Sequence, residues 1–473
     1  MNPTRRQWLQ AAAAVPLLSA CGAIPNPSAP GAPRVLSAAP ARLPVAGQAG
    51  LDVWAYDTSV PGPVLRFKRG DWLDLELHNR LPDATTIHWH GIRLPNAMDG
   101  VPHLTQAPIE PGARFRYRFR LPDAGTFWYH PHLGTAEQVE RGLAAALVVE
   151  EERPYPVDQD IVWLLDDWRL DAQGRIAEDF YRFHDVAHAG RLGQKLTVNG
   201  VEQPTQAVQA GERIRLRLIN ASNARIYQLA LEGLPGWLIA RDGVPAEAAI
   251  PWNGPMLLGP GMRADMVIDA TTPGVFELRD EQPRNPAVLA RLAVQGKAVA
   301  ARRPDPVPPP IEGLPAPVLD GALEQTVTIG GGARSRDGWP QQTEAERAAR
   351  RQRREAGARE ADPAWTLNGV AHTDHHHHHE PLFSVQRGRT VRLSFDNRTA
   401  WWHPMHLHGH HFQVLSRNGQ PLPDKPWRDT VLVAPGDRLE VAFVADNPGR
   451  WLIHCHVLEH HAGGMGTVFE VRG

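Results

Sequence analysis

The chain contains little cysteine, little net charge and no long apolar run. Its 473 residues include two cysteines, Cys21 and Cys455, so at most one disulfide can form. The formal net charge of −2 gives no overall field that would attract nucleic acid or an anionic membrane. Apolar residues make up 42% and charged residues 22%, which indicates a soluble globular protein, and the length predicts about three domains.

The apolar stretch near the N-terminus, residues 11–20, is too short to cross a bilayer. It follows Thr4–Leu9 (TRRQWL), which resembles a twin-arginine export signal. Leu18–Cys21 (LSAC) also resembles a lipoprotein signal, and the alternative is plain cleavage that removes Cys21 or leaves it free. Residues 1–21 are therefore predicted to direct the folded protein to the periplasm, with a possible lipid anchor. Residues 22–45, rich in Ala, Pro, Gly and Ser, are predicted to be a flexible tether.

Proline, glycine and histidine are abundant instead. The 44 prolines and 42 glycines favour many short strands and turns. A segment of alternating apolar residues that begins with Gly and ends with Asn occurs three times, at residues 70–79, 211–220 and 388–397. This two-residue period predicts an all-β fold of repeated β-sandwich domains. The domains are expected at residues 46–155, 156–300 and 326–473, with a Pro-rich linker at 301–325.

The 23 histidines are concentrated in a few clusters. Four His-x-His pairs lie at equivalent positions of the first and third repeats, whereas the middle repeat has none. Because alternate residues of a strand share a face, each pair points two imidazoles in one direction. Eight neutral imidazoles that converge between two domains can bind several transition-metal ions. The pairs are His88 and His90, His130 and His132, His406 and His408, and His454 and His456.

Cys455 lies between two of these histidines, so its side chain should point to the opposite face of the strand. His403, His460 and Met465 are expected to join it there. Two histidines, one thiolate and a weak axial methionine form a blue-copper electron-transfer centre. The alternative, an inert buried thiol, would leave the three neighbouring residues unexplained.

Together these motifs resemble the three-domain multicopper oxidases, the group that includes bacterial laccases and copper-tolerance oxidases. The matching segments are His-Trp-His-Gly (88–91), His-Pro-His (130–132), His-Pro-Met-His-Leu-His-Gly (403–409) and His-Cys-His (454–456) with a trailing His and Met. The resemblance covers nearly all of the mature chain. It implies three cupredoxin-like Greek-key β-sandwich domains, of which the middle one is a spacer.

The resemblance also implies four copper ions with ligands assigned by position. The type 1 ion would take His403, Cys455, His460 and Met465, the type 2 ion His88 and His406, and the type 3 pair His90, His130, His132, His408, His454 and His456. A small-molecule reductant would give electrons to the type 1 ion, and Cys455 would lead them to the other three, where dioxygen becomes water. Asp99 matches the acidic residue that supplies protons in the family, although an Asp-Gly turn is the alternative.

Three features depart from the family pattern. His461 stands where bacterial relatives often carry Glu, with Glu459 on the other side of His460, so His461 is predicted to relay protons unless it merely faces solvent. The chain has only seven methionines, and an Arg-rich segment, 347–354, replaces the Met-rich insert of copper-tolerance oxidases. A capping box at 343–346 predicts a short solvated helix there; the alternative is a lid that attracts anionic substrates. His375 to His379 is interpreted as a solvated loop, with a copper-loading or cuprous-ion site as the alternative.

These observations favour a laccase-like oxidase of phenols or aromatic amines, which is expected to be a monomer and to have no nucleic-acid partner. The alternative within enzymes is a cuprous-ion oxidase for copper tolerance. A structural cell-envelope protein and a copper storage protein are the alternatives from other classes. The full ligand set argues against the first, and Cys455 would have no purpose in the second.

Overall fold

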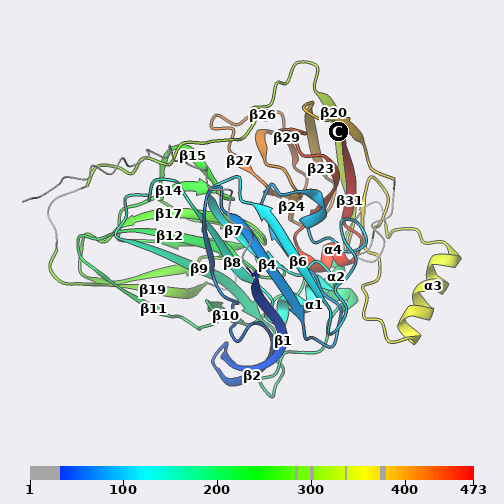
Figure 1. The fold of residues 1–473 in the computed structure, drawn as a ribbon, viewed down its shortest axis with the longest axis horizontal. Coiled ribbons are helices and arrows are strands. Elements are labelled where there is room, and N and C mark those ends of the chain that lie inside the picture. Colours follow the sequence, from blue (N-terminus) through cyan, green and yellow to red (C-terminus); the bar gives the residue numbers. More distant parts are fainter. Residues whose placement is uncertain (1–31, 283–285, 299–302, 336–337, 373–379) are drawn as a thin grey trace, which may run out of the picture. The chain divides into compact units, whose positions relative to one another are not determined.

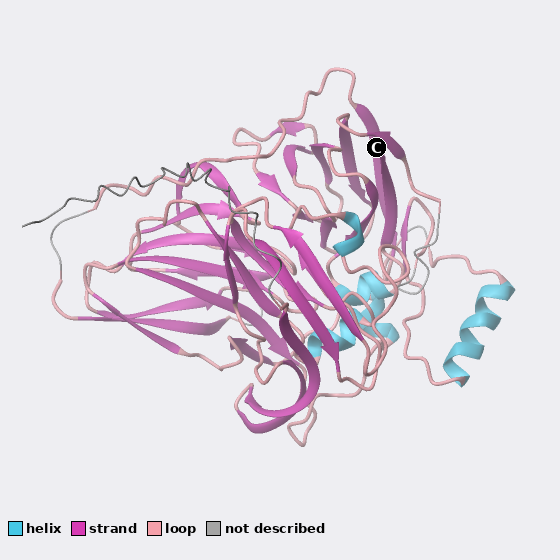
Figure 2. Ribbon diagram, in the orientation of Figure 1, coloured by secondary structure: helices cyan, strands magenta, loops and turns pink. Residues whose placement is uncertain are grey.

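Strands are the main regular structure of the protein, and few helices accompany them (Figure 1). The computed structural model describes residues 32–282, 286–298, 303–335, 338–372 and 380–473. Six sheets form three successive pairs along the chain. Strands predominate over helices in the ribbon, which confirms the all-β prediction (Figure 2).

Domain 1 contains two four-stranded sheets. Its strands are β1 Arg34–Val45, β2 Gln48–Tyr56, β3 Leu65–Lys68, β4 Trp72–Asn79, β5 His88–His90, β6 Arg114–Arg120, β7 Gly125–His130 and β8 Ala145–Glu150. The sheet orders are β2-β1-β4-β6 and β3-β8-β7-β5.

Domain 2 pairs a six-stranded sheet with a five-stranded one. Its strands are β9 Gln159–Trp168, β10 Lys195–Val198, β11 Thr205–Gln209, β12 Arg213–Asn220, β13 Tyr227–Leu231, β14 Gly236–Arg241, β15 Val244–Pro251, β16 Met256–Leu258, β17 Arg263–Asp269, β18 Gly274–Asp280 and β19 Ala287–Gln295. The sheet orders are β10-β9-β12-β17-β14-β15 and β11-β19-β18-β13-β16.

Domain 3 pairs a seven-stranded sheet with a five-stranded one. Its strands are β20 Leu323–Gly331, β21 Trp365–Leu367, β22 Ser384–Gln386, β23 Thr390–Asn397, β24 His403–Leu407, β25 Phe412–Arg417, β26 Gln420–Pro421, β27 Trp427–Arg428, β28 Thr430–Val433, β29 Arg438–Val444, β30 Gly449–Cys455 and β31 Gly466–Arg472. The sheet orders are β21-β20-β23-β29-β25-β26, with β27 on β25, and β22-β31-β30-β24-β28.

The helices of the described residues are short. They are η1 Asn96–Met98, α1 Thr135–Glu140, α2 Phe183–Ala187, α3 Glu344–Glu355 and α4 Leu458–Ala462. α3 begins with the predicted capping box between Thr343 and Glu346, and none of its residues is buried, as expected of a solvated helix. None of these helices combines the length and the apolarity needed to span a membrane.

The tether prediction for residues 22–45 is wrong over its second half. Residues 34–45 form β1, which pairs with β2 on one side and with β4 on the other. Leu36 and Ala38 are fully buried in the core of domain 1. A composition rich in alanine and proline therefore concealed a strand whose small side chains alternate between the core and the surface. Residues 22–31 lie outside the described residues.

The three Gly-to-Asn repeats form the central strands β4, β12 and β23, and their inward residues make up the cores between paired sheets. The asparagines that end them, Asn79, Asn220 and Asn397, are buried and make the same contacts. Each Nδ2 donates to at least two backbone carbonyls and each Oδ1 accepts the backbone N–H two residues later, at 2.7–3.1 Å. A single side chain thus satisfies the backbone of the turn that leads towards β5, β13 or β24.

Candidate metal centres

The four His-x-His pairs lie on or directly after strands that pair within each domain. In domain 1, β5 and β7 are antiparallel, with His88 opposite His130. In domain 3, β24 and β30 are antiparallel, with His406 opposite His454. The equivalent strand of domain 2, β13, carries Leu229 and Leu231 in a buried core. The three domains therefore share the same strand arrangement, and only domains 1 and 3 carry histidines at these positions.

The eight imidazoles meet where domains 1 and 3 face each other. All eight residues are at most 1% exposed. The ring centroids of His88 and His408 lie 4.0 Å apart, and those of His90 and His406 lie 3.8 Å apart. His132 faces His454, and His130 faces His456, at 5.1 and 5.3 Å. Each imidazole of domain 1 therefore has a neighbouring imidazole from domain 3, and the eight rings converge between the two domains.

Hydrogen bonds turn ring nitrogens of this cluster towards one another without a proton between them. His408 Nδ1 donates to Asp99 Oδ2 at 2.9 Å, and His454 Nδ1 donates to the Cys455 carbonyl at 2.9 Å. Their Nε2 atoms then carry only lone pairs, yet they lie 3.1 Å apart. Opposed buried lone pairs are unfavourable unless a cation lies between the rings, so the arrangement fits bound metal.

Burial favours the neutral form of five of these imidazoles. It lowers the pKa of His90, His130, His408, His454 and His456 well below the usual value, and the neighbouring imidazoles lower it further. A neutral imidazole offers a lone pair, which is the form that transition metals bind. The cluster is thus ready to accept metal across the ordinary pH range.

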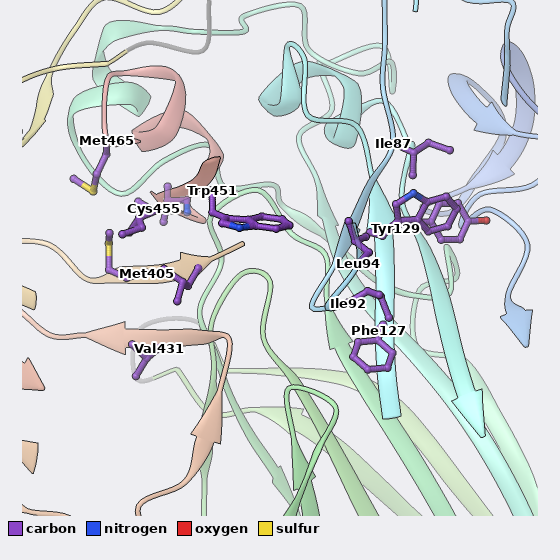
Figure 3. Close-up of a cluster of buried hydrophobic side chains, with 14 of the residues drawn as sticks. Ile87, Ile92, Leu94, Phe127, Tyr129, Met405, Val431, Trp451, Cys455 and Met465 are labelled. Atoms are coloured by element: carbon purple, nitrogen blue, oxygen red, sulfur yellow. Dashed lines mark hydrogen bonds between the residues drawn. The ribbon is translucent and has the colours of Figure 1, made fainter. Parts of the chain in front are cut away.

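A second group, formed by His403, Cys455 and His460, lies on the other face of β30. Cys455 Sγ is 3.6 Å from His403 Nδ1 and 3.6 Å from His460 Nδ1, and the two nitrogens are 3.2 Å apart. Met465 is fully buried, and Figure 3 shows it beside Cys455 in the same apolar cluster. Burial raises the pKa of the Cys455 thiol well above its usual range, so the thiolate forms only when a cation binds.

Both histidines of this group are oriented by their outer nitrogens. His403 Nε2 donates to Thr399 Oγ1 at 2.8 Å, and Thr399 Oγ1 donates in turn to Asn397 Oδ1. His460 Nε2 donates to the backbone carbonyl of His188 at 2.7 Å. Each Nδ1 is therefore left as a lone pair facing the sulfur, which is the arrangement that a metal ligand requires.

Asp99 contacts the cluster directly. Its Oδ2 accepts from His408 Nδ1, its Oδ1 lies 3.3 Å from His88 Nδ1, and its backbone carbonyl also accepts from His88 Nδ1. The residue follows η1 and is 1% exposed. Its carboxylate is thus placed between two of the predicted metal ligands, where the proton role predicted from the sequence is geometrically available.

His461 does not face solvent, which excludes that alternative. It is fully buried, and its ring lies 4.4 Å from that of His454 and 5.2 Å from that of His132. One nitrogen of each of these three residues lies within 4.8 Å of the others, a spacing at which they could hold a metal ion. Glu459 points elsewhere, because Arg191 N–H and Asn223 Nδ2 donate to its carboxylate.

The sequence reasoning missed two residues at these centres. Asp429 is fully buried, and its Oδ1 lies 3.3 Å from His90 Nε2 and 3.5 Å from His406 Nδ1. An acidic residue directly before the apolar strand β28 was the available signal. Met405 lies opposite Cys455 in the pairing of β24 with β30, and Figure 3 shows it in the same cluster. Its position between His403 and Leu407, two residues from each, already placed it on the Cys455 face.

Comparisons with known proteins agree with this geometry. Models of the multicopper oxidase family match residues 39–154, 159–296 and 346–473. Multicopper oxidase MmcO from Mycobacterium tuberculosis is 32% identical over 91% of this chain and 85% of its own.

The chain belongs to the multicopper oxidase family. A copper resistance protein A homolog from Pseudomonas syringae pv. tomato is 26% identical over 99% of both chains. The crystal structure of a multi-copper oxidase from Pseudomonas thermotolerans matches with a TM-score of 0.80 and 33% identity, over 93% of this chain and 98% of that one. The domains are accordingly cupredoxin-like, and the protein is a copper-dependent oxidoreductase with oxygen as acceptor. Copper of types 1, 2 and 3 is its cofactor.

Proposed function

We propose that this multicopper oxidase takes single electrons from small aromatic reductants, phenols or aromatic amines. The observation that carries the proposal is an exposed aromatic pair near His460. Phe183 and Trp339 are 44% and 46% exposed, and their ring centroids lie 5.0 Å apart. Phe183 begins α2, and His188, which directly follows α2, accepts a hydrogen bond from His460 through its backbone carbonyl. Flat aromatic molecules stack on such rings. The short helix α2 connects this pair to the residue that is hydrogen-bonded to His460 of the type 1 site.

The proposed ligand sets are those predicted from the sequence, and copper bound there supplies one-electron redox steps and the reduction of dioxygen to water. Cys455 links the two centres, because its neighbours His454 and His456 belong to the larger cluster while its thiol belongs to the smaller one.

Asp99 accepts a hydrogen bond from His408 and is proposed to donate protons to the cluster. Asp99→Asn should therefore slow oxygen consumption while the blue colour persists, and His461→Ala should tell whether the imidazole beside His454 shares this role.

The test of the aromatic donor site compares two kinds of donor. Phe183→Ala and Trp339→Ala should raise KM for a bulky phenol several-fold and leave kcat/KM for ferrocyanide, which cannot stack, unchanged. Wild-type protein should also be assayed with a phenol, a synthetic dye and cuprous ion side by side. Equal losses for both kinds of donor, or none for the phenol, would contradict an aromatic donor site at α2.

A second candidate is oxidation of cuprous ion for copper tolerance. The copper resistance protein A homolog supports it by its name. The His375–His379 run lies outside the described residues. The residues on either side of it are hydrogen-bonded to sequence neighbours of Met465: His372 N–H donates to Gly464 O, and Leu382 N–H donates to Val468 O. If the run serves cuprous ion, its deletion should selectively reduce cuprous oxidation. Unchanged cuprous oxidation after deletion would support the interpretation of the run as a solvated loop.

We also propose a periplasmic, monomeric protein with a possible lipid anchor at Cys21. Residues 1–21 lie outside the described residues, so the proposal depends on the sequence motifs alone. The native protein should partition with membranes, and Cys21→Ala should release it in soluble form after export. Soluble native protein in the periplasm would contradict the anchor, and size-exclusion chromatography would test the monomer.

A further inference from the structure

Two histidines form a stacked pair on the segment that covers the type 1 site. His184 lies in α2, and His188, four residues later, directly follows the helix. Their ring centroids lie 4.2 Å apart with an angle of 12° between the planes. This spacing places both side chains on one face of a helical turn, as in protein sites where two histidines bind one metal ion. Neither residue belongs to the predicted copper ligands.

The hydrogen bonds of the pair leave nitrogen lone pairs directed outward. His188 Nδ1 donates to the backbone carbonyl of His184 at 2.8 Å, which fixes the proton on Nδ1 and leaves Nε2 as an acceptor. Within the described part of the chain, neither Nε2 of the pair has a protein hydrogen-bond partner. The His184 side chain is 71% exposed and can therefore rotate until its Nε2 and that of His188 converge on one ion.

The remaining surroundings favour an ion that accepts few ligands. Asp185, the nearest acidic residue in sequence, is engaged by both terminal nitrogens of the Arg169 guanidinium. The Trp401 ring stands edge-on to His188, with centroids 5.4 Å apart, and adds no charged ligand. Asp185 Oδ1 also lies 3.7 Å from His184 Nδ1, but the arginine already engages this carboxylate. Two imidazoles with no further carboxylate available suit a monovalent d¹⁰ ion such as cuprous copper, which accepts two nitrogen ligands, better than zinc, which takes four.

The pair is also connected to the type 1 site by one hydrogen bond. His188 accepts from His460 Nε2 through its own carbonyl at 2.7 Å. An ion on the His188 ring would thus be separated from the type 1 ligand by the atoms of a single residue and one short hydrogen bond.

We propose that His184 and His188 bind cuprous ion as an electron donor of the oxidase. Each ion would lose one electron to the type 1 centre and leave as cupric ion. Four such electrons and four protons convert one dioxygen into two waters, so the step needs only the oxidant that the enzyme already uses. The inference rests on the oxidase activity of the family and is independent of whether phenols are oxidised.

Silver ion tests binding without redox chemistry, because it resembles cuprous ion in charge and filled d shell but is not oxidised by the enzyme. Calorimetric titration of copper-loaded wild type should show a silver site that His184→Gln weakens by at least about tenfold. His78→Gln, on β4, is the matched control and should leave that site intact. The His375–His379 run contributes equally to all three proteins, so the difference between them is the measurement.

Kinetics separate this inference from the proposed function. His184→Gln should raise KM for cuprous ion and leave kcat/KM for a phenol unchanged. Identical silver binding in wild type and His184→Gln would overturn the proposal, as would loss of a zinc site with silver binding intact. Failure of the wild type to oxidise phenols would count against the aromatic donor site alone.

Discussion

Cys455 is the residue on which both centres depend. Its thiol faces His403 and His460, and its peptide neighbours His454 and His456 belong to the larger cluster. Cys455→Ser should abolish the blue colour, which arises from the thiolate, and oxidase activity, while up to three coppers per chain still bind. Visible absorbance and copper analysis measure both effects, and Cys21→Ser should keep the colour. A colourless wild type with its full copper content would contradict the assignment.

Thr399 is a positioning residue whose effect should be spectroscopic. Its hydroxyl accepts from His403 Nε2 and donates to Asn397. Thr399→Val removes both bonds and leaves a buried N–H unsatisfied, so unfolding free energy should fall by about 1–3 kcal/mol. The blue absorption band and the type 1 reduction potential should shift as His403 loses its fixed orientation. Thr399→Ser should restore both, which a purely steric role of the threonine methyl would not permit.

For single residues, the sequence predicted which metal ligands lie together better than it predicted the other side chains that contact them. His-x-His and His-Cys-His spacing determines which face of a strand a ligand occupies, so the larger cluster and the opposite position of Cys455 follow from alternation. His460 and Met465 lie in and after α4, where alternation gives no information. Asp429 could not be found in this way, because its contacts with His90 and His406 and its ion pair with Arg263 arise from tertiary packing. The sequence left open the alternative that His461 faces solvent, because the burial of this residue depends on how α4 packs against His132 of domain 1.

Among the elements, the segment around α2 is held over the type 1 site by an ionic network. Asp179 accepts from Arg182 and Arg191, and Arg191 N–H also donates to Glu459 in α4. Burial would raise the pKa of Asp179, but these arginines outweigh it and lower the pKa from 3.8 to about 2. A lowered pKa contributes stability that is complete above pH 3.8 and is lost as pH falls towards 2.

Asp179→Asn should therefore lower the unfolding free energy at neutral pH, and its difference from wild type should shrink as pH falls from 5 towards 2.5. Denaturant unfolding at several pH values, on protein of equal copper content, measures this. Asp396→Asn, which removes a surface ion pair with Arg398, is the control and should show little difference at any pH. A difference that is constant with pH would exclude the carboxylate as the source.

The predictability of elements followed their length and periodicity. The three central strands were found because alternation is strong over eight residues, and α3 because its capping box is local. β1 was missed because proline and alanine conceal its alternation. α2 and α4 are five residues each, too short for a helical pattern, and they form because tertiary contacts hold them.

In the whole molecule, Arg263 joins the three domains. It lies on β17 of domain 2, donates to the Thr126 carbonyl of domain 1, and forms two hydrogen bonds to Asp429 of domain 3 at 2.8 and 2.6 Å. Both partners are fully buried. The ion pair fixes the carboxylate that contacts His90 and His406, so it supports the cluster from outside.

Arg263→Met should leave Asp429 charged and unpaired and should cost about 3–5 kcal/mol of unfolding free energy. Copper content of the cluster should fall as well, because Asp429 would no longer hold the two imidazoles. Thermal unfolding and copper analysis measure these effects. Arg241→Met, which breaks a peripheral pair with Asp424, should cost at most about 1 kcal/mol. Full copper retention in Arg263→Met would show that Asp429 is held by other contacts.

The position of Cys455 between His454 and His456 has a consequence for motion. The histidine cluster is shared between two domains, so any slow opening of the molecule would separate its halves and let small molecules pass. The path from the sulfur to the nearest imidazoles of the cluster runs through consecutive residues around the end of β30, and its length is set by covalent bonds rather than by how closely the domains fit. Breathing of the interface can therefore regulate access for dioxygen and escape of water without slowing the arrival of electrons.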